Sequence, residues 1–493
     1  MSAAPEFLRN TPEQERSRVN SNKAEIRRRL PERLEIKLSQ NETAVLQGVE
    51  QVVDNIDPIW QVQKRTPFYY KDPKNLSEAK RRELEEEIRE LGKTNSEILS
   101  PYTYAEKRNG TIIAVPYHEK FAEEIGPIVK NIDLTQLIIP THDYELMAQF
   151  YERLTTLKEA FEGDKWEEAD KIRFRKDWVN RVEFVIGPFE TNFDHFEIKT
   201  TVQGLVGVID EQATRGLDRI VNAASTYVEG KEPPEVDLKV LFVTAATGIV
   251  NPSTGEPFKA QVLPNDPRKA KEFGSRGLIF INLLEEHFNN ILYPVMRRVF
   301  DHGLLVKFTK QGLFEAYRDW IALHEFHHPV NREEVQDERQ GSLFLPFHEL
   351  HCDISALSMA KTLTDHGVLD SDEFEAILIV QIARALNDIY NYHFSDKEFP
   401  DPYAKGSRAL FNYLAEFAGL RPLREDSKLG LYQEKEVIAA VNNLVGKFNI
   451  DAKDADFEET QELFDRFDSG NGYKFAEPLL RDLFEEPRPF LSS

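Results

Sequence analysis

The sequence predicts a mixed α+β protein in which a strand-containing middle portion is followed by a largely helical C-terminal half. Four runs rich in Val, Ile and Phe, bounded by Gly, Pro, Asn or Asp, are typical of strands: residues 182–190, 200–210, 236–246 and 276–284. Helical segments separate these runs, and from about 286 to 485 the apolar periodicity is almost wholly helical. Because both periodicities occur in one chain, an α+β fold is expected.

Two further segments refine this prediction. A charged helix is predicted over about 76–93, where RELEEEI resembles the end of a Nudix box. Arg89 stands where that motif requires glycine, so a solvated surface helix is the better interpretation. The segment 251–267 contains four prolines and is expected to form no regular element.

Composition and charge exclude several classes of protein. The 493 residues are 41% hydrophobic and carry 62 Lys+Arg against 85 Asp+Glu, a formal net charge of −23. Such a chain can bury a sizeable core, while its surface repels nucleic acids and anionic membranes. The N-terminus lacks an apolar signal region, no stretch approaches the roughly 18 apolar residues of a membrane span, and Cys352 is the only cysteine. We therefore expect a soluble cytoplasmic protein, monomeric or homodimeric, that binds neither nucleic acid nor membrane.

A histidine-rich segment carries the clearest chemical signal. Residues 319–330, DWIALHEFHHPV, contain the motif H-E-x-x-H, in which His324 and His328 are four residues apart. Residues at i and i+4 share one helix face, so the two imidazoles can chelate one zinc ion. Glu325 projects beside that face, where it can act as the general base toward zinc-activated water.

A catalytic zinc requires a third protein ligand, and the segment FHELHCDISALSMA at 347–360 offers one on another predicted helix. Glu349 is expected to complete a site for one Zn²⁺ per chain. Asp353, one turn beyond Glu349, can accept a hydrogen bond from the ring N–H of a zinc-bound histidine and fix its tautomer.

Other interpretations of these two segments stay open. H-E-x-x-H also arises by chance, and the alternative is a pair of surface helices with satisfied histidines. His327, His348 and His351 are expected to be packing or supporting residues rather than ligands. Cys352 could ligate zinc, but it would point off the Glu349 face of its helix, so a small buried residue is expected.

Beyond the zinc motif, the sequence from about 180 to 480 resembles the dipeptidyl peptidase III family of metallopeptidases. The resemblance rests on IGPFETNFD (186–194), AQVLPNDPRKAKEFGSRGLIFINL (260–283), HELHCDISALS (348–358) and DPYAKGSRALFNYLAE (401–416). The family's usual zinc motif has one more residue, H-E-x-x-x-H, although some members share the five-residue form. The resemblance implies two lobes around a cleft: a mixed lobe with a β-barrel and a mainly helical lobe that bears the zinc.

The resemblance also implies substrate-binding residues. Glu190 and Asn265 match residues that hold the free amine of the substrate, and Arg408, in the segment similar to a helix that starts with the family's catalytic histidine, is a further substrate-binding candidate. Val262 stands where the family has an asparagine, which removes one polar contact.

Two catalytic positions depart from the family. Its transition-state tyrosine falls on Asn192, and its catalytic histidine falls on or next to Tyr403. Both side chains here can still donate a hydrogen bond to an oxyanion, so Asn192 and Tyr403 are candidate partners of Glu325. The expected function is hydrolysis of an amide bond in a short peptide with a free amine. The alternatives are a repurposed hydrolase of a non-peptide amide or modified amino acid, and a catalytically silent zinc-binding protein.

The same resemblance divides the chain. Residues 1–60 would form an N-terminal extension, 61–210 and 245–290 the mixed lobe, and 211–244 and 291–485 the helical catalytic lobe. This division agrees with the order of strands and helices that periodicity predicts.

Overall fold

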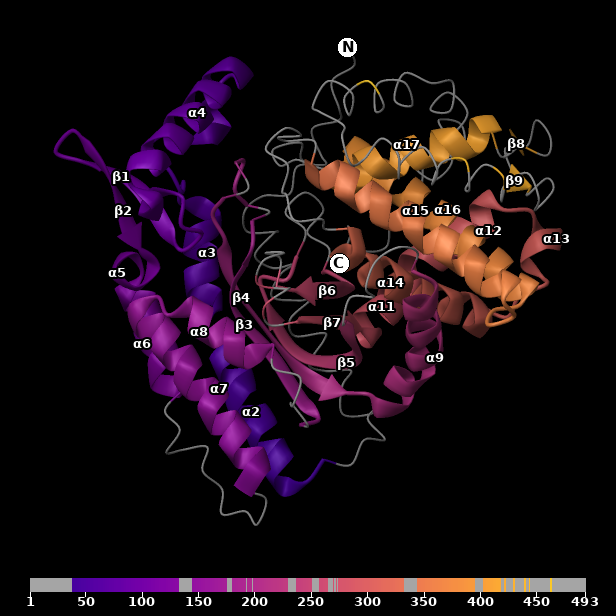
Figure 1. Cartoon of the computed structure of the whole chain (residues 1–493), viewed down its shortest axis with the longest axis horizontal. Helices are drawn as coiled ribbons and strands as arrows, with labels where there is room; N and C mark the ends of the chain where they lie inside the picture. Colours follow the sequence, from indigo (N-terminus) through magenta and orange to yellow (C-terminus); the bar gives the residue numbers. More distant parts are fainter. Residues whose placement is uncertain are drawn as a thin grey trace.

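The computed structural model describes most of the chain between residues 38 and 417. The described ranges are 38–132, 144–174, 180–228 without 192 and 197, 236–250, 257–264, 274–331, 344–394 and 402–417, together with 421–422, 429–430 and residues 269, 272, 439, 443 and 462. A central sheet separates an N-terminal group of helices from a C-terminal helical body (Figure 1). The predicted α+β fold class is confirmed, and the expected barrel takes the form of a curled half-barrel sheet.

The N-terminal part consists of helices and one hairpin. Its elements are α2 Gln40–Asp54, α3 Asp57–Arg65, the 3₁₀ turns η2 Pro73–Asn75 and η3 Ser96–Ile98, α4 Glu78–Thr94, β1 Thr103–Arg108, β2 Thr111–Pro116, α5 Tyr117–Lys120, α6 Ala122–Asn131, α7 Tyr144–Gly163 and α8 Trp166–Arg173. Helix α4 confirms the predicted charged helix. The β1–β2 hairpin was not predicted, although Asn109 and Gly110 at its turn have φ angles of 50° and 83°. Asn-Gly is a strong signal for such a turn.

The central sheet explains how strand-like runs far apart in sequence come together. Its strands are β3 Val182–Glu190, β4 Thr201–Ile209, β5 Val236–Thr247, β6 Ala260–Leu263 and β7 Ser275–Phe280. Within the described residues the order is β3-β4-β5-β7-β6, with β5 parallel to β7 and the other pairs antiparallel. All four predicted runs contain a strand, but the last one turns into helix after Phe280.

The expectation that 251–267 holds no regular element was wrong. Residues Ala260–Leu263 form β6, which pairs with β7 at the edge of the sheet. Pro257 and Pro264 flank this strand instead of interrupting it. An edge strand tolerates such prolines because one side of its backbone needs no partner in the ladder.

Helix α2 packs on the sheet through a row of valines. Val45, Val49 and Val52 are all at most 2% exposed and belong to one core cluster with residues of β3 and β4. Gly204 on β4 allows this approach, since a Cβ there would lie 2.3 Å from Ile56 Cδ1.

The domain boundaries predicted at 60 and 244 fall inside two elements, α3 and β5. The division into lobes otherwise remains a prediction.

The helical body supplies the framework for the histidine motif. Its elements are α9 Glu211–Tyr227, α11 Ile281–His287, the π-helical turn η5 Phe288–Leu292, α12 Tyr293–Val299, α13 His302–Leu305, α14 Lys310–Asn331, α15 Phe344–Asp365, α16 Ser371–Phe394 and α17 Pro402–Phe417, followed by the short strands β8 Arg421–Pro422 and β9 Leu429–Gly430. Among the described helices, none combines the length and apolar character needed to cross a bilayer.

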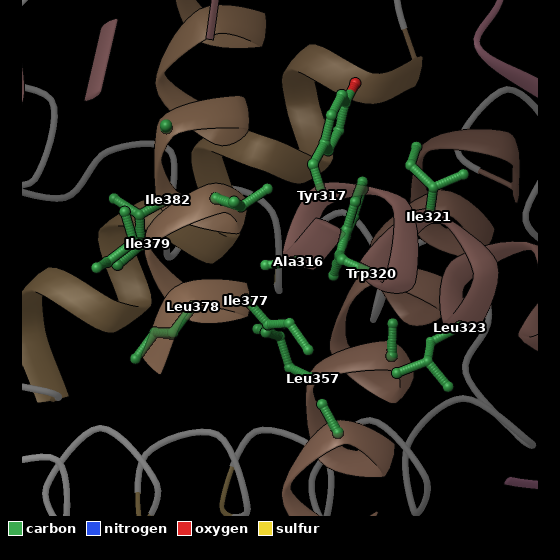
Figure 2. Close-up of a cluster of buried hydrophobic side chains, with 14 of the residues drawn as sticks. Ala316, Tyr317, Trp320, Ile321, Leu323, Leu357, Ile377, Leu378, Ile379 and Ile382 are labelled. Atoms are coloured by element: carbon green, nitrogen blue, oxygen red, sulfur yellow. The ribbon is translucent and has the colours of Figure 1, made fainter. Parts of the chain in front are cut away.

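A dense apolar cluster fixes α14 against its neighbours (Figure 2). Trp320 and Leu323 of α14 meet Leu357 of α15 and Ile377 of α16 in this cluster, and each is at most 1% exposed. Burying one such side chain contributes roughly 1.5–3 kcal/mol. The cluster lies about one helical turn from the histidine motif, so it holds α14 and α15 in place next to that motif.

Candidate metal centre

The H-E-x-x-H motif lies in a largely buried stretch of α14, in which only His328 is half-buried. Residues 319–327 of α14 are each classed as buried, including His324 at 4% and Glu325 at 7% exposure. The facing segment 346–350 of α15 is buried as well. The alternative of two surface helices is therefore wrong, because both segments are buried and their polar side chains need partners inside the protein.

The three predicted metal ligands converge on one point between α14 and α15. Glu349 Oε2 lies 3.3 Å from His324 Nε2 and 3.9 Å from His328 Nε2. The rings of His324 and His328 are 4.8 Å apart and nearly perpendicular, at 86°. Glu325 Oε2 lies 4.0 Å from His328 Nε2, on the same side of the cluster. The structure thus brings together His324, His328, Glu349 and Glu325.

These residues fit a zinc ion. Ligand atoms about 2.0–2.1 Å from zinc at tetrahedral angles are about 3.3 Å apart, which equals the separation of Glu349 Oε2 from His324 Nε2, while the 3.9 Å to His328 Nε2 is somewhat longer. Glu349 Oε2 is shielded from solvent, yet no described residue offers it a well-directed hydrogen-bond donor. A buried carboxylate oxygen of this kind is costly unless a cation or a donor meets it. His324, His328 and Glu349 could therefore hold a metal ion.

The electrostatics of the site favour a cation at the same point. Burial alone would lower the pKa of His324, but the adjacent carboxylates of Asp353 and Glu349 raise it to about 10. Burial opposes ionisation of Glu349 as well, yet the two histidines hold its pKa below the usual value. In the metal-free protein, the proton on His324 therefore supplies the positive charge that the carboxylates of Asp353 and Glu349 favour.

Asp353 lies against the side of the His324 ring that faces away from Glu349. Its Oδ1 lies 2.7 Å from His324 Nδ1, so the Nε2 atom is left facing Glu349. Arg384 of α16 donates to both carboxylate oxygens of Asp353, at 2.8 and 2.7 Å. Despite burial, Arg384 and His324 hold the pKa of Asp353 below its usual value.

Arg384 was missed by sequence reasoning. Its guanidinium carbon lies 4.7 Å from the ring centre of Trp320 and 5.6 Å from that of Tyr403. Carboxylate neighbours raise its pKa against the effect of burial. The available signal was a single arginine in the apolar run ILIVQIARALNDI, since a buried cation needs a partner.

His348 and Cys352 lie beside the second ring nitrogen of His328. His348 Nε2 lies 3.0 Å from His328 Nδ1, and Cys352 Sγ lies 3.6 Å from the same nitrogen. Cys352 does point away from Glu349, as predicted, but it points toward the other side of the His328 ring. A second i, i+4 pair on α15 was the sequence signal for this contact.

His327 has the structural role that was expected. Its Nδ1 lies 2.7 Å from the carbonyl oxygen of Leu323, one turn earlier in α14. Burial lowers the pKa of His327 to about 4, so its ring is neutral at ordinary pH. Among the described residues, neither group of converging ligand-type atoms includes His327, which fits a packing residue.

The remaining predicted residues are only partly placed. Tyr403 and Arg408 lie on α17, half-buried, and Tyr403 reaches the site through Arg384. Glu190 ends β3, where its backbone pairs with Thr201, but its side chain lies outside the described residues, as do Asn192 and Asn265.

Val262 lies on β6, 7% exposed, within the apolar cluster that also contains Trp320 and Ile321. Its side chain is thus accounted for by packing.

Similarity to known proteins is weaker in sequence than in structure. No family model matches the chain. Nudix hydrolase 3 of Arabidopsis thaliana is 24% identical over 356 residues, which cover 65% of this chain and 41% of that protein. The chain thus spans well under half the length of this curated relative.

Two solved structures match nearly the whole chain. Dipeptidyl peptidase III from Caldithrix abyssi superposes with a TM-score of 0.71 at 17% identity, covering 90% of this chain and 93% of the other. Dipeptidyl-peptidase III from Corallococcus sp. strain EGB gives 0.72 at 18% identity, with 92% of each chain covered. At these identities the match establishes architecture. This chain therefore has the fold of the dipeptidyl peptidase III structures.

Proposed function

We propose that this chain is a zinc-dependent hydrolase that cleaves an amide bond in a short peptide with a free amine. One observation carries the proposal: the buried Glu349 Oε2, lacking a well-directed donor among the described residues, lies 3.3 and 3.9 Å from the Nε2 atoms of His324 and His328. A purely structural zinc site needs no general base, yet Glu325 stands beside this cluster. The shared fold with dipeptidyl peptidase III structures supports the substrate class.

Each residue then has a distinct task. Zinc, when bound, would polarise the scissile carbonyl and lower the pKa of water. His324, His328 and Glu349 hold the ion. Glu325 accepts a proton from the attacking water and returns it to the leaving amine. Asp353 fixes the His324 ring so that its Nε2 faces the ion.

The substrate-binding part of the proposal rests on the sequence resemblance. Glu190, Asn265 and Arg408 would hold the amine-bearing end of the substrate, and Asn192 and Tyr403 would donate to the developing oxyanion. The contact of Tyr403 with Arg384 supports a place near the metal centre. Because the family's tyrosine and histidine are replaced, we expect little or no dipeptide release from standard chromogenic dipeptidyl substrates. We expect turnover of another short amine-bearing amide.

Nudix-type hydrolysis, suggested by the name of the curated relative, finds no support on α4. Arg89 occupies the position where that motif requires glycine, and it forms an i, i+4 ion pair with Glu85 at 2.9 Å. Glu87 accepts from Tyr70 and pairs with Lys71 at 3.4 Å. These are the contacts of a charged surface helix, far from α14 in Figure 1.

The proposal is tested by metal content and turnover measured on the same protein. The full chain should bind zinc and hydrolyse at least one member of a panel of aminoacyl and dipeptidyl fluorogenic amides. Glu325→Gln should keep the zinc and lose at least about 100-fold in kcat, the lower range for removing a general base. Glu315→Gln is the matched control, since Glu315 is exposed on the same helix. Equal turnover by Glu325→Gln and the control would refute the mechanism, and a zinc content in Glu349→Ala equal to that of the unchanged protein would refute the ligand set.

A further inference from the structure

Helix α15 carries two interleaved pairs of ligand-type side chains. Glu349 and Asp353, four residues apart, both face His324. His348 and Cys352, offset by one residue, are likewise four apart and face the Nδ1 side of His328. One helix therefore presents one pair to each histidine of the motif.

We infer that His328 Nδ1, His348 Nε2 and Cys352 Sγ form a second metal site, for a zinc-class ion, which shares the His328 ring with the first. The three donor atoms lie within 4.8 Å of one another. His348 Nε2 is 3.0 Å from His328 Nδ1, and Cys352 Sγ is 3.6 Å from His328 Nδ1 and 3.8 Å from His348 Nε2. This inference uses a ligand of the proposed zinc site but does not require that the site hydrolyses anything.

The spacing matches a metal better than it matches apolar packing. Zinc–nitrogen and zinc–sulfur bonds of about 2.0–2.1 and 2.3 Å place N···N about 3.3 Å and N···S about 3.6 Å apart at tetrahedral angles. All three observed separations lie near these values. Two imidazoles and one thiolate are also the soft and borderline donors that zinc prefers, and they leave a fourth position open.

The surroundings suit an ion that is bound through the protein. His348 is 4% exposed and Cys352 is fully buried, so few waters can compete for the ion. Binding would displace the proton on His328 Nδ1 and the thiol proton of Cys352, and both would be released to solvent. The His328 ring would then bridge two cations, Nε2 to the first and Nδ1 to the second. The competing account is a simple hydrogen bond from His328 Nδ1–H to His348 Nε2, with Cys352 only packed beside it.

Cobalt(II) titration of the metal-free full chain separates these accounts without any variant. Cys352 is the only cysteine among the 493 residues, so thiolate-to-cobalt charge-transfer absorption in the near ultraviolet can come from no other residue. We expect two ions per chain by elemental analysis, together with this absorption band. One ion per chain without the band overturns the second site and leaves the zinc proposal intact.

Variants then assign each ion. Cys352→Ser should abolish the band and reduce the content to one ion, while His351→Gln, the neighbouring histidine on α15, should retain both. His324→Ala should lose the first ion and keep the thiolate band. The wild-type chain could instead bind a single ion and show the thiolate band. If His324→Ala then left both the ion and the band unchanged, this second site would be supported and the first ligand set refuted. A band that persists in Cys352→Ser would refute the assignment of the sulfur ligand.

Discussion

Replacing Asp353 with asparagine tests how the metal centre is supported. The substitution keeps the shape of the side chain but removes the charge that lies 2.7 Å from His324 Nδ1. Loss of such an outer partner lowers metal affinity roughly 10- to 100-fold. Since tenfold corresponds to about 1.4 kcal/mol, the expected loss in binding free energy is about 1.4–2.8 kcal/mol. Competition with a chelator of known zinc affinity measures it directly.

The same change also uncovers a buried cation. Arg384 loses the two charge-assisted bonds of 2.8 and 2.7 Å to Asp353, and keeps a contact of 3.4 Å with Asp388. Breaking one side of a buried pair costs about 3–5 kcal/mol, and the remaining carboxylate places the expected loss near about 3 kcal/mol. The unfolding of the metal-free protein in urea reports this second effect separately from zinc affinity.

Asp365→Asn is the matched control for both measurements. Asp365 lies on the same helix with its side chain 58% exposed and pairs with Lys361. We expect zinc affinity and unfolding free energy close to wild type, because exposed ion pairs contribute at most about 1 kcal/mol. If Asp353→Asn matched this control in zinc affinity, the carboxylate would not be holding His324 for the metal, and the reasoning would fail.

Four further predictions concern pH and packing. His324, with its pKa raised to about 10 in the metal-free protein, must lose a proton to bind zinc, so apparent affinity should rise about tenfold per pH unit between about pH 7 and 9; a flat profile would contradict this. The same proton stabilises the metal-free fold fully below about pH 6.5, and this contribution is lost as pH rises through about 10. His327 has its pKa lowered to about 4, so the unfolded chain is protonated first and stability should fall by about 3 kcal/mol from pH 6.5 to 4. The variant His327→Gln should show a shallower acid slope in urea unfolding, and an unchanged slope would rule out this cause. In Gly406→Ala the new Cβ would lie 3.1 Å from Leu350 Cβ, so we expect a lower melting temperature than in Gly126→Ala, where the space is open and alanine stabilises a helix by about 0.5–1 kcal/mol; equal melting temperatures would show that α17 yields freely.

The fold was predictable where composition and periodicity agree. The β3, β4 and β5 runs are rich in β-branched and aromatic residues, and their strands match the predicted ranges within a residue or so. Strand β6 escaped prediction because four residues between two prolines carry too little pattern. The packing of α2 on β4 was not visible either, since periodicity shows that a helix has an apolar face but not what covers it.

The candidate site divides along the same line. The i, i+4 spacing on α14 and α15 indicated which side chains share a face, and the structure brings His324, His328 and Glu349 together. Spacing within one helix cannot say which atoms of the next helix it meets. For that reason the approach of Cys352 to the second nitrogen of His328, and the bond from Arg384 to Asp353, became visible only in three dimensions.

The placement of α2 has a consequence for how the chain is made. The helix packs against β4 and β5, and Thr247, the last residue of β5, follows Asp54 by about 190 residues. At roughly 5–20 residues per second, the ribosome needs about 10–40 s to deliver that partner. A 15-residue helix alone is marginally stable in water, so the valines at 45, 49 and 52 stay exposed during this interval. We expect the emerging N-terminal segment to be a binding target for chaperones that recognise apolar chain, until the sheet arrives to cover it.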